Sequence, residues 1–188
     1  MVSFSKRSIT LVELLIAIAL VGLLVIAVFS LDNYARFHLI TSDRRARLQN
    51  EASFCIEQIV KDGIRAIGYV NDTAISICSS TELQIRVDDG DGEIEATDNS
   101  DPSGDFMVRY YRNNHDLEYY PDYDRNSTQY EILTSKVVNP AGVDIFTCSD
   151  GIIRIELMLR HRPTASSSLD NPQFQIISRS YIRAESVR

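Results

Sequence analysis

The longest apolar stretch of the chain lies near its N-terminus and predicts a membrane-spanning helix. Between Ile9 and Phe29 only Thr10 and Glu13 are polar. As an α-helix with a rise of about 1.5 Å per residue, this stretch spans roughly 31 Å, which matches the hydrocarbon thickness of a bilayer. It is also longer than the core of a secretory signal peptide, which has about 7–15 apolar residues. We therefore expect a transmembrane helix over residues 9–31.

The charges that flank this stretch predict its orientation. Lys6 and Arg7 precede it, and Asp32 is the first charged residue after it. Because positively charged flanks stay on the cytoplasmic side of a membrane, we expect residues 1–8 in the cytoplasm and the rest of the chain outside it.

A second helical pattern follows directly. No proline occurs between Asp32 and Ile67, and apolar residues recur there at helical spacing. We expect an amphipathic helix over residues 32–68, with Gly68 as its C-terminal glycine. The predicted packing stripe consists of Tyr34, Phe37, Leu48, Ala52, Cys55, Ile59 and Ile67, widened by Ile56, Val60 and Ile64.

The polar side of this helix carries three arginines near the expected membrane surface, namely Arg44, Arg45 and Arg47. A solvated helix face is the favoured interpretation. Contact with lipid phosphates or with the acids of a neighbouring subunit is the alternative.

The remaining residues, 69–188, alternate between apolar and polar in several runs and predict strands at 82–88, 106–112, 152–160 and 173–183. Hairpin turns are expected at Asn113-Asn114 and at Ser149-Asp150-Gly151. A sheet with one apolar face on the amphipathic helix would bury both surfaces. The predicted fold class is therefore α+β, a long N-terminal helix packed on an antiparallel β-sheet domain.

The formal net charge is −7, and the acids concentrate between Arg86 and Glu131. Binding to phosphates requires the opposite sign, which argues against a nucleic-acid partner. Within this region Asp89, Asp91 and Glu93, with Asp88 beside them, alternate with glycines as in calcium-binding loops. Val87 occupies the first ligand position of an EF-hand alignment and breaks that pattern. A solvated turn is favoured over a calcium site, and no other cofactor is expected.

The cysteines Cys55, Cys78 and Cys148 show no CxxC spacing, and the histidines are scattered, which argues against a zinc site. Outside the cytoplasm, one disulfide and one buried thiol are expected. The spacing does not determine the pairing. We prefer Cys78 with Cys148 because both lie in strand-like runs, and we interpret Cys55 as a core residue.

No catalytic motif is present, so an enzyme is not expected. A group of tyrosines crowds one predicted hairpin, namely Tyr110, Tyr111, Tyr119, Tyr120 and Tyr123. Cross-strand or core packing is the favoured interpretation, and an aromatic binding surface is the alternative.

The stretch "KRSITLVELLIA", residues 6–17, resembles the start of type IV prepilins, the family of type IV pilins and type II secretion pseudopilins. The N-termini of that family read basic residue, Gly, apolar residue, Thr or Ser, Leu, any residue and Glu. The matching positions are Lys6, Arg7, Thr10, Leu11 and Glu13. Two positions depart from the pattern, since Ser8 stands in place of Gly and Ile9 in place of Phe.

The resemblance implies processing and assembly. A prepilin peptidase would cut between Ser8 and Ile9 and methylate Ile9, and Glu13 would become the fifth residue of the mature chain. The Glu13 carboxylate would then meet the N-terminal amine of a neighbouring subunit, and each charge would favour the ionised form of the other. The alternative interpretation is that Glu13 lies near the cytoplasmic interface and reaches out to lipid headgroups. Thr10 and Leu11 belong to the same assembly segment.

The resemblance also implies a type IV pilin-like fold, with the precursor held in the inner membrane and the β-domain in the periplasm. Ser30 stands where major pilins commonly have a proline, which favours a minor subunit. J-type pseudopilins and W-type minor pilins are most similar. We expect a subunit that initiates or caps a type IV pilus or a pseudopilus. The alternative is an unprocessed, membrane-anchored periplasmic protein that binds a ligand or a surface.

Overall fold

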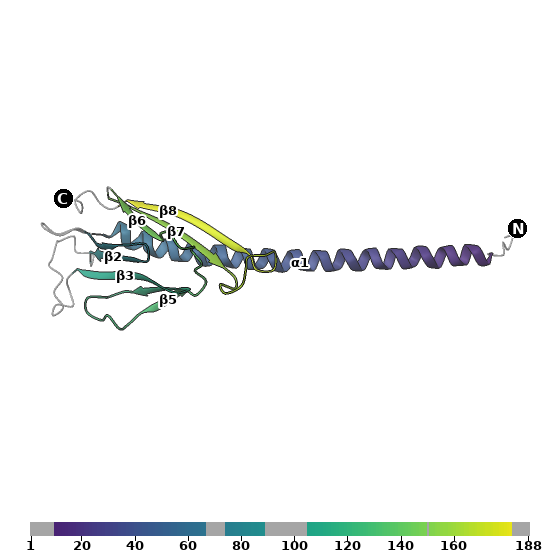
Figure 1. Ribbon diagram of the computed structural model, residues 1–188, viewed down its shortest axis with the longest axis horizontal. Coiled ribbons are helices and arrows are strands. Elements are labelled where there is room, and N and C mark those ends of the chain that lie inside the picture. Colours follow the sequence, from purple (N-terminus) through teal and green to yellow (C-terminus); the bar gives the residue numbers. More distant parts are fainter. Residues whose placement is uncertain (1–9, 67–73, 89–104, 150, 182–188) are drawn as a thin grey trace, which may run out of the picture. The chain divides into compact units, whose positions relative to one another are not determined.

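The computed structural model describes residues 10–66, 74–88, 105–149 and 151–181. Over these residues the chain is α+β, with one long N-terminal helix, α1, and two antiparallel sheets (Figure 1). The chain divides into two units, residues 1–42 and 43–188.

Helix α1 runs from Leu11 to Ile64. Within the first unit its apolar side chains are exposed, and this part is long and apolar enough to cross a membrane. Ion pairs one turn apart, Arg36 with Asp32 and Arg47 with Asp43, support the polar parts of the helix surface. The structure thus agrees with the helix that the apolar run predicts.

The second unit buries one stripe of α1. Its buried residues are Leu48, Ala52, Cys55, Ile56, Ile59, Asp62 and Gly63. The predicted stripe was wrong for three residues, Tyr34, Phe37 and Ile64, which are exposed. Tyr34 and Phe37 belong to the first unit, whose described residues contain no element besides α1. Ile64 is the last helical residue, and Ile67 lies outside the described residues.

The end of the helix differs from the predicted boundary at residue 68. Helix α1 stops at Ile64 because the chain is drawn into contact with the end of a strand. The carbonyl of Arg65 accepts a hydrogen bond from the Asp88 amide at 3.0 Å, and Ala66 forms a bridge with Val87. Gly68 lies outside the described residues. Extended pairing therefore replaces the last helical turn that the sequence predicts.

A single sheet was expected, and the structure has two. The first has the order β1-β2-β3-β4-β5 and the second the order β6-β7-β8, all antiparallel. Their bounds are β1 Ile75–Cys78, β2 Glu82–Val87, β3 Phe106–Asn113, β4 Asp116–Tyr120, β5 Glu131–Thr134, β6 Phe146–Ser149, β7 Ile152–Arg160 and β8 Gln173–Tyr181. After β5 the chain crosses to the second sheet, where Val137 bridges Leu159.

Both sheets contribute to one hydrophobic core beneath α1. Alternate residues point inward, and β7 buries Ile153, Ile155, Leu157 and Leu159 in this way. Gly63 permits a close approach of the helix, since a Cβ atom there would lie 2.7 Å from the Ser180 hydroxyl oxygen of β8. Both predicted hairpins are present, β3–β4 and β6–β7, but each turn begins one residue later than predicted, because Asn113 and Ser149 are the last residues of their strands. The turns contain left-handed backbone angles, with φ of 56° at Asn114 and 73° at Gly151.

Candidate assembly site

Glu13 closes a capping box at the start of α1. Its Oε2 atom accepts hydrogen bonds from the Thr10 amide at 2.9 Å and from the Thr10 hydroxyl at 3.0 Å. The Glu13 amide donates in return to the Thr10 hydroxyl oxygen at 3.3 Å. Thr10 is thus the N-cap and Glu13 the third helical position, the arrangement that satisfies the first free amides of a helix. The sequence carries this signature as Thr-x-x-Glu before an apolar run.

The cap does not by itself explain a carboxylate at this position. Glutamine also serves the third position of a capping box, and the charge of Glu13 adds only about 0.3–1 kcal/mol there through the helix dipole. A carboxylate costs about 2.5–3.5 kcal/mol at the bilayer centre and less toward the interface, and Glu13 lies near one end of the apolar run, where a cap stabilises by about 1 kcal/mol. Both hydrogen bonds from Thr10 end on Oε2, and no donor within the described residues contacts Oε1. The second oxygen can therefore accept a bond from another chain.

The surroundings of Glu13 are apolar and face outward. Leu11 is 76% exposed, and Val12, Leu14 and Leu15 are exposed as well. These side chains give the segment a surface suited to lipid or to similar helices. The proposed processing residues, Ser8 and Ile9, lie outside the described residues.

The predicted metal ligands Asp89, Asp91 and Glu93 also lie outside the described residues. Asp88, next to them, is tied to the end of the helix, where the Arg65 guanidinium donates to its carbonyl oxygen at 2.7 Å. In the part of the chain that the structure describes, no group of three acidic, cysteine or histidine side chains is arranged to hold a metal ion.

The tyrosines of the β3–β4 hairpin pack against one another and against Arg109. Tyr110 and Tyr119 are cross-strand partners, with ring centroids 5.0 Å apart. The Arg109 guanidinium carbon lies 4.5 Å from the ring centroid of Tyr111 and 4.8 Å from that of Tyr123. An internal cation thus occupies the position that an aromatic surface would offer to a ligand.

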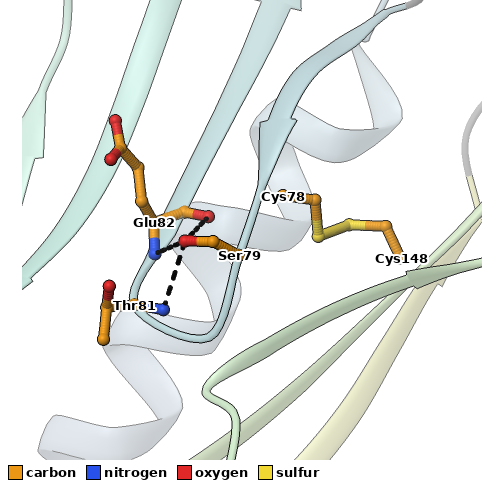
Figure 2. Close-up of a disulfide and its surroundings, with 5 residues drawn as sticks. All are labelled: Cys78, Ser79, Thr81, Glu82 and Cys148. Atoms are coloured by element: carbon orange, nitrogen blue, oxygen red, sulfur yellow. Dashed lines mark hydrogen bonds between the residues drawn. A yellow bond between two sulfur atoms is a disulfide. The ribbon is translucent and has the colours of Figure 1, made fainter.

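A disulfide joins the two sheets. Cys78 of β1 and Cys148 of β6 are bonded, with their Cα atoms 6.1 Å apart (Figure 2). This is the pair that the sequence analysis preferred. On the β1 side, the Ser79 hydroxyl oxygen accepts a hydrogen bond from the Glu82 amide at 3.0 Å and orders the following turn. Cys55 is free and buried, as expected, and burial raises the pKa of its thiol to about 12.

Two of the three arginines near the expected membrane surface contact acids of their own chain. Arg44 donates to the Asp170 carboxylate and carbonyl, and Arg47 pairs with Asp43. Arg45 is exposed. These contacts favour the solvated-face interpretation for Arg47 and give Arg44 the role of fixing the loop before β8.

A buried acid between helix and sheet was not predicted from the sequence. The Asp62 side chain is in the core, with a residue exposure of 3%, and its Oδ2 atom accepts a 2.5 Å hydrogen bond from the Tyr110 hydroxyl. Desolvation raises the pKa of Asp62 above its ordinary value, and the hydroxyls of Tyr110 and Tyr119 oppose this rise. The pair orients α1 on the five-stranded sheet.

The raised pKa of Asp62 predicts a specific pH dependence of stability. The folded state binds this proton more tightly than the unfolded state, so the associated stability is present below about pH 4 and is lost as the pH rises through the raised pKa. Asp62→Asn does not titrate. Its melting temperature should therefore rise relative to that of the wild type as the pH increases from about 4 through the raised pKa of Asp62.

Thermal melts of both proteins across this range test the prediction, with Glu57→Gln, an exposed acid on the same helix, as the charge-matched control. A difference between wild type and Asp62→Asn that stays constant with pH would contradict it.

Three comparisons with known proteins complete the description of the chain. No protein-family model, curated protein or solved structure matches it.

Proposed function

We propose that this chain is a minor pilin or pseudopilin, a structural subunit that helps to initiate or cap a type IV pilus or a type II secretion pseudopilus. The precursor is cut by a prepilin peptidase between Ser8 and Ile9 and methylated on Ile9. The mature chain stays in the inner membrane, with its β-domain in the periplasm, until it joins other subunits through α1.

The observation that carries this proposal is Glu13 within an exposed apolar helix. Thr10 engages one oxygen of the carboxylate, and a neutral glutamine would cap the helix as well. A charge in this apolar setting is favourable when an opposite charge lies within about 4–6 Å. The N-terminal amine of an adjoining subunit, released by cleavage, supplies that charge.

Further support comes from the second unit. A long helix on antiparallel sheets is the architecture that the resemblance implies. The Cys78–Cys148 disulfide is of the kind that oxidising compartments such as the periplasm preserve.

The rival function is that of an uncut, permanently anchored ligand-binding protein. The main candidate surface for a ligand is formed by the tyrosines of the β3–β4 hairpin, and there the Arg109 guanidinium already stacks on Tyr111 and Tyr123. The two functions differ in the first residue of the membrane-extracted protein, which intact mass determines. A chain that starts at Ile9 supports the pilin-like subunit, and a chain that keeps residues 1–8 supports the rival.

A further inference from the structure

In the part of the chain that the structure describes, the outer edge of the three-stranded sheet is unpaired along β8. Only β7 pairs with this strand, and within the described residues no other backbone group bonds to residues 173–181. In Figure 1, β8 (yellow) lies at the margin of the sheet with no strand beyond it. Its nine residues contain no proline or lysine and pair with β7 without a bulge. Of the features that commonly block a free edge, β8 has only one, the charge of Arg179.

Two arginines face each other on the solvent side of this sheet. Arg154 of β7 and Arg179 of β8 are direct cross-strand partners, and both are exposed. Like charges in this position are destabilising. Arg154 is compensated by Glu156, whose Oε2 atom lies 2.8 Å from its Nη2 atom. Among the described residues, no carboxylate forms an ion pair with Arg179. Within the described residues, the sheet therefore presents a positive charge without an ion-pair partner beside its edge strand.

Apolar side chains flank this charge on the same strand. Ile177 is 52% exposed and Tyr181 is 68% exposed, each two positions from Arg179. Because side chains alternate along a strand, all three project from one face. The exposed face of β8 therefore carries a positive side chain, Arg179, between two apolar ones, Ile177 and Tyr181.

We propose that β8 binds an extended acidic segment of a partner protein, which adds a strand to the sheet. Backbone hydrogen bonds along the edge provide affinity, and side chains at alternate positions provide selectivity. The segment carries an acid opposite Arg179 and apolar residues two positions to either side, opposite Ile177 and Tyr181. This inference uses only residues of the second unit and does not depend on the proposed pilin-like function.

A second copy of this chain fits the edge less well. β8 contains no acidic residue, so pairing with another β8 leaves Arg179 without a carboxylate opposite it in every register. A partner strand that carries an acid removes the repulsion between Arg154 and Arg179.

The test uses the full-length protein in detergent and a fluorescent seven-residue peptide. The peptide has glutamate at its centre, valine two positions to either side and threonine elsewhere. Anisotropy should show saturable binding, about ten-fold weaker for the same peptide with a central lysine. Arg179→Glu should reverse this preference, whereas Arg45→Glu, which changes the net charge equally on an exposed helix position, should leave it unchanged. Circular dichroism checks that both variants are folded.

Backbone methylation of the peptide separates strand addition from simple charge attraction. Alternate amides of an added strand face β8, so methylating one alternate set should abolish binding, and methylating the other set should not. The proposal is overturned by an absence of saturable binding, by equal affinity for the glutamate and lysine peptides, or by equal effects of the two methylated sets. It is also overturned if sedimentation shows a dimer that Arg179→Glu dissociates, because the edge would then bind a second copy.

Discussion

Glu13→Gln is expected to reduce co-assembly with other pilin-like subunits by at least about ten-fold while leaving expression and membrane insertion intact. Glutamine preserves the capping box with Thr10 but removes the charge. The amine of the neighbouring subunit would then be buried without its partner, at a cost of about 3–5 kcal/mol, which corresponds to more than a hundred-fold in an equilibrium constant. Co-purification of a tagged chain with its sibling subunits measures the effect.

Thr10→Ala is the matched control, because it removes the cap and keeps the charge. Loss of an N-cap costs about 1 kcal/mol, so this variant should assemble far better than Glu13→Gln. If Thr10→Ala fails while Glu13→Gln assembles normally, Glu13 serves the cap alone and the charge-pairing role is wrong.

Removing the disulfide should produce the largest change in the stability of the β-domain. Cys78 and Cys148 are 70 residues apart in sequence, and closing a loop of that length stabilises a fold by about 4 kcal/mol. The double variant Cys78→Ser/Cys148→Ser should therefore melt about 10 °C lower than the wild type. Circular dichroism of the full-length protein in detergent provides the melting temperatures.

The change in melting temperature on adding a reductant serves as the control for this prediction. Reduced wild type should melt close to the double variant, and Cys55→Ala should keep the full response to reductant because its disulfide is intact. A wild-type melting temperature that does not change on reduction would contradict the stabilising role of the bond.

The long helix and the longer strands were predictable because their patterns are regular. The strands β3, β7 and β8 largely alternate in burial as their sequences alternate in polarity, and the turns at Asn114 and Gly151 use residues that tolerate a positive φ. The strand β2 alternates in polarity only, since Gln84 and Arg86 are buried together with its apolar residues. The Cys78–Cys148 pair could also be preferred from the sequence, since both residues lie in strand-like runs.

The division into two sheets was not predictable from the pattern of the chain. β1 and β5 have four residues each, too few for a clear alternation, and the crossing after β5 depends on the pairing of Val137 with Leu159. The early end of α1 depends likewise on a contact distant in sequence, between Ala66 and Val87. Such tertiary contacts override local propensity.

The candidate site was predictable in its residues but only in part in its geometry. The apolar run located Glu13, and the Thr-x-x-Glu spacing held the signal for the cap. Asp62 was missed because an acid within an apolar stripe gives no sign of its buried hydroxyl partner, Tyr110, which lies 48 positions away. The open edge at β8 likewise emerges only from the order of the strands.

The intact mass of the membrane-extracted protein tests the central claim most directly, because Glu13 can meet a free amine at Ile9 only after cleavage. The account predicts a chain that lacks residues 1–8 and carries one added methyl group. Ser8→Gly, which restores the residue typical of type IV prepilins, should give the same mature mass and at least as large a cleaved fraction. A wild-type chain that keeps residues 1–8 would contradict the account, and cleavage of Ser8→Gly alone would then show that Ser8 blocks the peptidase.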